Sequence, residues 1–260
     1  MQDHPTQSEI KEDPLPPESN SNRLWSARRR PALLAGLVIG LVLFLIWLPS
    51  APRTALLTAL LTQRALMSML FIFALIVLSL LWSVGQRLDD RIFVLVNLRG
   101  SRSKWLDSVM WLATQVGNQG TALLSAAVFF LTGSRRLAVE IILGTLTLWI
   151  LVETIKALSD RARPFLALEG TRVVGWRERG RSFPSGHTAQ TFFLVTLLSQ
   201  RFQLGPAATV ALYALAMLVG FTRIYLGAHY PRDVIAGAVL GSVWGVLAGL
   251  VDLYWHAVRF

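Results

Sequence analysis

The stretch GRSFPSGHTAQTFFL, Gly180 to Leu194, places polar and conformationally special residues directly before an apolar run. Polar groups at membrane depth cost free energy, and they mark functional sites where they occur. A helix that begins at Pro184 to His187, PSGH, presents free backbone N–H groups and the positive end of its dipole, which favour an anion. Gly186 also lets a ligand approach the backbone closely. We therefore expect an anion-binding site at the start of this helix.

The composition around this stretch is that of an integral membrane protein. Of the 260 residues, 53% are hydrophobic and only 15% are charged, whereas soluble domains carry about a quarter charged residues. The net charge of +10 suits nucleic acid, anionic lipid or an anionic substrate. Because the basic residues are spread over loops between apolar segments, we expect no nucleic acid partner. The chain has no cysteine, which excludes disulfides and cysteine-ligated metals.

The apolar segments predict an all-α fold, a polytopic membrane helical bundle. Residues 1–31 are polar and rich in Pro, Ser and Glu, which predicts a disordered tail. Residues 32–64 are expected to form an extra N-terminal membrane helix and its connection, and residues 65–258 a six-helix core. A spanning helix needs about 20 apolar residues, so two of the segments look short. The seven segments cover 32–48, 65–84, 119–132, 137–155, 187–200, 206–222 and 233–253.

Two further patterns concern packing rather than chemistry. Residues 85–118 mix charged and apolar side chains, which predicts one or two amphipathic helices on the membrane surface. The last apolar segment carries a glycine at every fourth position, which places a stripe of small residues on one helix face and permits close helix contact. The stripe consists of Gly237, Gly241, Gly245 and Gly249.

Two more clusters of polar residues lie at segment ends. In KALSDRARP, residues 156–164, Lys156 and Arg163 are seven positions apart, so a helix would turn both to one side. In TRIYLGAHYPRD, residues 222–233, an aspartate follows a histidine by four positions and can accept the imidazole Nδ1–H. Counting the crossings brings all three clusters to one membrane face. The set gathered there is Lys156, Arg163, Ser185, His187, Arg223, His229 and Asp233.

The chemistry of this set suits a multiply charged oxyanion, and phosphate fits best because arginine binds its oxygens bidentately. One histidine, oriented by an aspartate, can act as a nucleophile toward phosphorus, and the other can protonate the leaving group. The cations would stabilise the charge of the transition state. No carboxylate cluster suited to Mg²⁺ accompanies them, so we expect a metal-independent mechanism with no cofactor.

The three clusters closely resemble the signatures of the type 2 phosphatidic acid phosphatase superfamily, Lys-x6-Arg-Pro, Pro-Ser-Gly-His and Ser-Arg-x5-His-x3-Asp. The resemblance covers roughly residues 65–255, and Thr222 stands where serine is usual. It implies that His229 is a nucleophile forming a phosphohistidine, that Asp233 orients it, and that His187 is the general acid and later assists water. The phosphate ligands that it implies are Lys156, Arg163, Arg223 and Ser185, with the Gly186 backbone.

Several functions remain open at this point. The first is hydrolysis of a phosphomonoester or pyrophosphate on a membrane lipid, with polyprenyl pyrophosphate, phosphatidic acid, phosphatidylglycerol phosphate or a sphingoid phosphate as substrates. Alternatives are a phosphotransferase with a lipid or glycan acceptor, a haloperoxidase that shares the anion pocket, and a non-enzymatic anion transporter or channel. The resemblance implies a cell-membrane protein with an extracytoplasmic active site. The positive-inside rule conflicts with this placement if all seven segments span.

The remaining charged residues near the clusters have simpler interpretations. Loop arginines at a membrane commonly bind lipid headgroups, and Glu153 precedes Lys156 by three positions, which suits an ion pair. Arg161 and Arg232 are expected to be solvated or structural. The arginines expected at headgroups are Arg172, Arg177, Arg179 and Arg181.

Overall fold

The computed structural model describes residues 62–98 and 103–258, together with a few separate positions between 39 and 58, and it describes side chains as far as Val251. The chain divides into two compact units, Met1–Phe44 and Leu45–Phe260. All that follows concerns the second unit. The predicted tail over 1–31 lies outside the described residues, and so does most of the predicted extra segment over 32–64. Both stay predictions.

The second unit is helical, and the part of the chain that the structure describes contains no strand, which confirms the predicted all-α class. The segment predicted at 187–200 becomes α9, and the last one becomes α11. The elements are α3 (Arg64–Ser79), α4 (Ser83–Asn97), α5 (Lys104–Thr114), η3 (Gln115–Gly117), α6 (Gln119–Leu131), α7 (Arg135–Ser159), α8 (Pro164–Ala167), α9 (Gly186–Arg201), α10 (Pro206–Tyr225) and α11 (Pro231–Val258).

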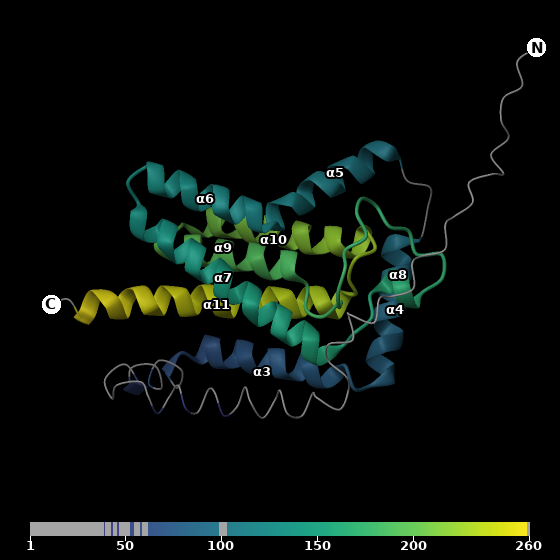
Figure 1. Cartoon of the computed structure of the whole chain (residues 1–260), viewed down its shortest axis with the longest axis horizontal. Coiled ribbons are helices and arrows are strands. Elements are labelled where there is room, and N and C mark those ends of the chain that lie inside the picture. Colours follow the sequence, from purple (N-terminus) through teal and green to yellow (C-terminus); the bar gives the residue numbers. More distant parts are fainter. Residues whose placement is uncertain are drawn as a thin grey trace, which may run out of the picture. The chain divides into compact units, whose positions relative to one another are not determined.

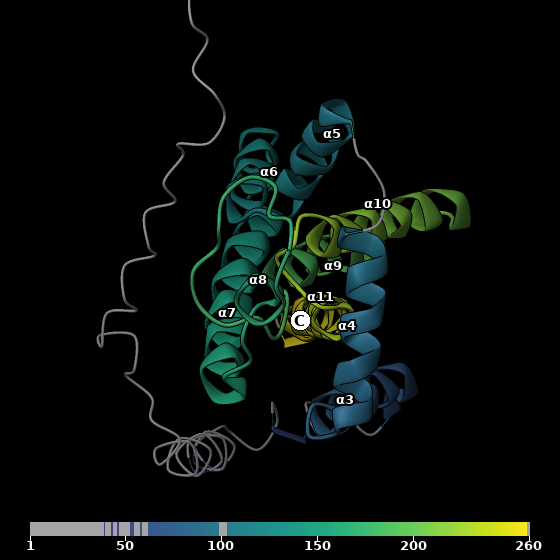
Figure 2. The same cartoon turned by 90° about the vertical axis from the view of Figure 1, so that its right-hand side faces the viewer.

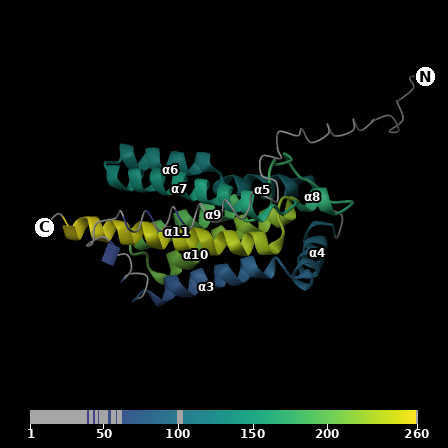
Figure 3. The ribbon, with the colours of Figure 1, turned by 60° about the horizontal axis from the view of Figure 1, so that its bottom comes forward.

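Helix α9 lies in the middle of the bundle. Figures 2 and 3 show α9 and α11 side by side, with α6 and α7 on one side and α3 on the other. Most of α9 is buried, including polar side chains such as Gln190, whose Nε2 donates to Thr145 Oγ1 of α7 at 3.0 Å. Its neighbours are other helices, so α9 needs neither the length nor the apolarity of a lipid-facing span. This accounts for the short polar pattern of its sequence.

The glycine stripe of α11 faces α9, as its spacing predicted. A Cβ at Gly241 would collide with the backbone of Ala189, and one at Gly237 would lie 2.5 Å from the carbonyl oxygen of Ser185. Because the glycines carry no side chain, the two helix backbones approach closely. This contact fixes the start of α11 beside the start of α9.

The predicted segment 65–84 is not one straight helix, and this expectation is corrected. Helix α3 ends at Ser79, and α4 begins at Ser83 with its axis bent by 94°. Helix α4 carries charged residues among apolar ones, unlike the apolar α3. Together with α5 it supplies the two amphipathic helices that residues 85–118 allowed for.

The number of membrane crossings stays a prediction. By length and composition, three candidate spans occur among the described residues, and a fourth if the bent pair α3 and α4 counts as one. Helix α6 is apolar but has only 13 residues. The three candidate spans are Arg135–Ala167, Pro206–Tyr225 and Pro231–Val251.

One end of the bundle collects the ends of four helices. The C-terminal ends of α7 and α10 lie there beside the N-terminal ends of α9 and α11, with α4 running across them (Figure 1). The connection 168–185 is attached to this end by Asn97 at the end of α4. The Asn97 side-chain nitrogen donates to the carbonyl oxygens of Arg172 and Tyr225 at 2.9 and 2.8 Å. The connection is therefore held close to the helix ends that carry the motif residues.

Candidate active site

The two predicted site residues of the first motif, Lys156 and Arg163, do not lie on the same helix, because α7 ends between them. Helix α7 stops at Ser159, and Asp160 adopts a left-handed conformation with φ of 52°. Arg163 then has an extended backbone before Pro164, as the residue before a proline prefers. The helical-spacing argument for Lys156 and Arg163 is therefore wrong. Both residues nevertheless line one cavity.

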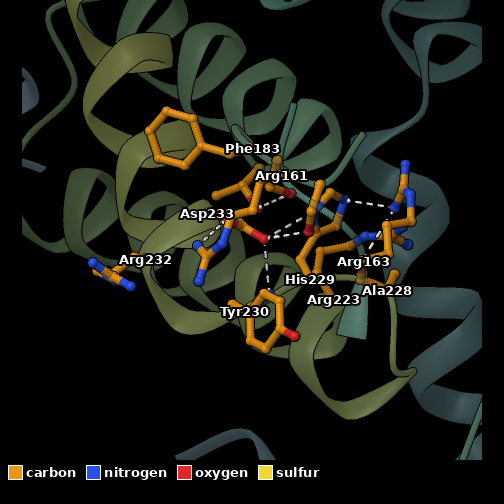
Figure 4. Close-up of polar contacts among 12 residues, drawn as sticks. Arg161, Arg163, Phe183, Arg223, Ala228, His229, Tyr230, Arg232 and Asp233 are labelled. Atoms are coloured by element: carbon orange, nitrogen blue, oxygen red, sulfur yellow. Dashed lines mark hydrogen bonds and ion pairs between the residues drawn. The ribbon is translucent and has the colours of Figure 1, made fainter. Parts of the chain in front are cut away.

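The nucleophile candidate His229 lies in the short connection between α10 and α11 and is 1% exposed. Its Nε2 is 3.3 Å from Nη1 of Arg163. Because a guanidinium can only donate, Nε2 accepts here, and the ring proton belongs on Nδ1. His229 Nδ1 lies 3.6 Å from Oδ2 of Asp233 and has no hydrogen-bond partner. The Asp233 carboxylate therefore faces the His229 ring as predicted, but the distance between Nδ1 and Oδ2 is longer than that of a hydrogen bond (Figure 4).

Electrostatics favour a neutral His229 at neutral pH. Burial, with the nearby charges of Arg163 and Arg223, lowers the pKa of His229 well below its usual value. A neutral imidazole with an unprotonated Nε2 is the form that can attack an electrophile. The buried surroundings therefore keep this ring in its nucleophilic form.

A residue that the sequence did not single out, Glu178, lies among the cationic groups. Its carboxylate pairs with Arg223 and, at 3.0 Å, with Nη1 of Arg163. It also lies 3.9 Å from Nδ1 of His187 and 3.8 Å from Nε2 of His229. Partial burial opposes its ionisation, but Arg223 and the other positive groups outweigh this and lower the pKa of Glu178. An anion bound here touches the groups of all three motifs.

The two arginines are held by buried contacts of their own. Arg163 is 1% exposed and donates to the backbone carbonyls of Ala228, Arg179 and Gly180. Arg223 donates from Nη1 to Thr114 Oγ1 at 2.8 Å. These contacts fix both guanidinium planes before any ligand arrives, which reduces the entropy lost on binding.

The other predicted phosphate ligands differ in where they point. Lys156 Nζ pairs with Glu153 at 2.8 Å, which confirms the expected ion pair. The Lys156 side chain also lines the cavity that contains Gly186. The Ser185 hydroxyl is buried and contacts Thr188 Oγ1 at 2.9 Å instead. Its role as a phosphate ligand stays a prediction.

Two cavities meet at Glu178 and His187. One, of about 340 Å³, contains Lys156, Arg163 and His229 and is bounded by apolar residues of α7, including Trp149. The other, of about 350 Å³, contains Arg223 and a wall of aromatic and apolar side chains. That wall is formed by Trp111, Phe165, Val173, Val174, Trp176 and Leu226. An anion site flanked by apolar walls suits a phosphate attached to an apolar body.

This arrangement matches known proteins. The sequence model of the PAP2 superfamily matches residues 137–256, which include all three motifs. Phosphatidylglycerophosphatase B of Bacillus subtilis is 30% identical over 154 residues, covering 54% of this chain and 72% of that protein. The chain belongs to the PAP2 superfamily.

Further PAP2 relatives extend the match. A lipid A 1-phosphatase of Rhizobium johnstonii is 44% identical over 72 residues, 27% of this chain and 28% of that protein. The chain thus spans less than a third of this relative's length. The crystal structure of a transmembrane PAP2-type phosphatidylglycerolphosphate phosphatase from Bacillus subtilis superposes with a TM-score of 0.61 at 23% identity. The match covers 73% of this chain and 96% of that one, so this PAP2 chain shares its fold and is an integral membrane protein.

Four arginines that have no role in the PAP2 motifs form ion pairs inside the protein. Arg172 pairs with Asp107 at 2.7 Å and lies over the Tyr225 ring, so the headgroup interpretation is corrected for this residue. Arg181 pairs with Asp160. Arg161 and Arg232 are largely buried in ion pairs, which favours the structural alternative over the solvated one.

Proposed function

We propose that this protein is a membrane phosphatase that hydrolyses a phosphomonoester or pyrophosphate on a lipid. The observation that carries the proposal is the position of the Glu178 carboxylate, between two fixed guanidinium groups and within 4 Å of two imidazoles. A phosphate group in the same place would meet the same partners. It would also carry more charge and more acceptor oxygens than the carboxylate.

The proposed reaction has two steps. In the first, His229 Nε2 attacks phosphorus, the bond to the lipid oxygen breaks, and His187 gives that oxygen a proton. Arg163, Arg223 and Lys156 stabilise the charge on the remaining oxygens. In the second, water attacks phosphorus, His187 takes its proton, and phosphate leaves His229. A group that donates in one step and accepts in the next is what two-step hydrolysis needs.

The substrate is proposed to be a lipid because the site lies at the end of a membrane helix bundle and has apolar walls. The two relatives described above act, by their names, on lipid A and on phosphatidylglycerol phosphate. Polyprenyl pyrophosphate and phosphatidic acid have the same combination of an apolar body and an anionic group. All four classes therefore belong in a substrate panel.

The test is phosphate release by the purified full-length protein from that panel, with and without EDTA. We expect release from at least one lipid, unchanged by EDTA, and a loss of roughly 1,000-fold or more in His229→Ala. His4 belongs to the polar segment 1–31 and lies outside the match to the PAP2 family, so His4→Ala is the matched control and should keep full activity. A strict Mg²⁺ requirement, or an active His229→Ala protein, would contradict the proposal. Transfer of phosphate to an added lipid or glycan acceptor without release would indicate a phosphotransferase instead.

The active face is proposed to be extracytoplasmic. The turn between α6 and α7 lies at the other end of the described helices (Figure 1), and Arg135 and Arg136 follow it as the first residues of α7. Arginines in short loops favour the cytoplasmic side. The cations of the active face do not count against this placement, because the phosphate site accounts for Lys156, Arg163 and Arg223.

A further inference from the structure

A buried group of charges lies behind the proposed catalytic residues and joins Asp233 of the third motif to three residues that have no motif role. It runs from Asp233 through Arg161 to Asp89 on α4, and from Asp89 on to Arg232. The side chains of the two carboxylates are at most 2% exposed and those of the two arginines at most 13%. Buried charges persist when they are paired, and here two positive charges balance two negative ones.

Arg161 is the member of this group that touches Asp233. Its Nη1 donates to Asp233 Oδ1, and its Nη2 donates to Asp89 Oδ2 and, at 2.8 Å, to Gln86 Oε1. The guanidinium also lies over the ring of Tyr230, 4.3 Å from its centre. In Figure 4 the Asp233 carboxylate lies between Arg161 on one side and His229 on the other.

The two oxygens of Asp233 have different partners. Oδ2 accepts from the Ser182 hydroxyl and from the Tyr230 backbone N–H, and it is the oxygen that faces His229. Oδ1 accepts from Arg161. Without Arg161, Oδ1 would be a buried anionic oxygen without this partner, and the carboxyl group would turn or take up a proton. Either change removes the fixed acceptor that faces the ring proton of His229.

We propose that Arg161 is a positioning residue for the phosphatase reaction, which holds Asp233 charged and oriented toward His229 and is itself held by Asp89. The inference rests on the proposed function. Among the described residues, the contacts of the Arg161 guanidinium are with Asp233, Asp89, Gln86 and the Tyr230 ring and not with the anion site, so its hydrogen bond to the proposed catalytic set is the one to Asp233. Helix α4 thereby takes part in catalysis at a distance, because its Asp89 anchors the arginine.

The test compares Arg161→Gln with Arg232→Gln in the purified full-length protein. Both variants remove a buried guanidinium that pairs with Asp89, but only Arg161 contacts Asp233. We expect Arg161→Gln to lower kcat by about 10- to 100-fold, the size of a lost hydrogen bond to a charged group, with KM changed by less than about threefold. Arg232→Gln should lower the midpoint of thermal unfolding but keep kcat within about threefold.

Two further measurements distinguish a positioning role of Arg161 from a general loss of stability. Arg161→Lys retains the charge but has no second nitrogen in the fork, so its kcat should lie between wild type and Arg161→Gln. Orthovanadate, a phosphate analogue, should raise the unfolding midpoint of each variant as it does in wild type, because the anion site is intact. Equal kcat losses in Arg161→Gln and Arg232→Gln, or a change confined to stability, would overturn the positioning role. A wild-type protein without lipid phosphatase activity would instead overturn the proposed function.

Discussion

Glu178 places a negative charge where the proposed reaction needs a phosphate. Both of its carboxylate oxygens are engaged by arginines, Arg163 and Arg223. A phosphate cannot take these partners while the carboxylate holds them. In the proposed reaction, substrate binding therefore requires the Glu178 carboxylate to move away from the arginines. The free protein is thus a state in which its own side chain competes with the substrate.

This competition predicts the behaviour of Glu178→Gln. The amide has nearly the same shape but no charge, so it competes more weakly for the guanidinium groups. We expect the variant to bind orthovanadate about 10-fold more tightly, by the weaker hydrogen bonding of a neutral competitor. Isothermal titration with orthovanadate measures this directly.

Glu169→Gln is the matched control, because Glu169 lies in the same connection and is exposed. Its affinity for orthovanadate should equal that of wild type. Weaker binding by Glu178→Gln would mean that the carboxylate helps to build the anion site and does not compete for it.

The helices show which features the sequence could predict. The periodic apolar segments gave the helices of the core, and the glycine spacing gave the contact between α11 and α9. The bend between α3 and α4 was missed because apolarity continues past Ser79, while the change of direction comes from packing against the site end of the bundle. The spacing of apolar residues along the sequence indicates which helix face is buried, but not the angle between two successive helices.

Some residues of the candidate site could be predicted from the sequence, and others could not. The motif residues were predictable because their types and spacings carry chemistry, as in His229 and Asp233. Glu178 and Asp89 were not, since each acts through partners far away in the sequence and follows no local pattern. For Arg161 the sequence alone does not distinguish a solvated side chain from a structural one. Only the tertiary fold shows that it contacts Asp233.

For the whole molecule, the two ends of the bundle differ in chemistry. The site end carries the connection 168–185, whose Trp176 is 86% exposed, and the other end carries the short turn after α6. The proposed orientation places the first outside the cytoplasm and the second inside. The chain has no cysteine, so a single introduced thiol reports the side of the membrane without a background.

We expect Arg177→Cys to react with a membrane-impermeant maleimide in intact cells, and Ser134→Cys to react only after the membrane is opened. Both positions are exposed, so accessibility to the reagent depends on the side of the membrane. Full reaction of both in opened membranes is the control for expression and folding. The reverse labelling pattern would place the active face in the cytoplasm.

The central claim is that a lipid phosphate passes its phosphoryl group to His229. The most direct measurement is a rapid quench of the purified protein with a lipid carrying radioactive phosphate, followed by mapping of the label. We predict an acid-labile, base-stable label on the peptide that contains His229, formed and lost within a turnover and absent from His229→Ala. Phosphate release by wild type with no such label, or a label that persists in His229→Ala, would contradict the account.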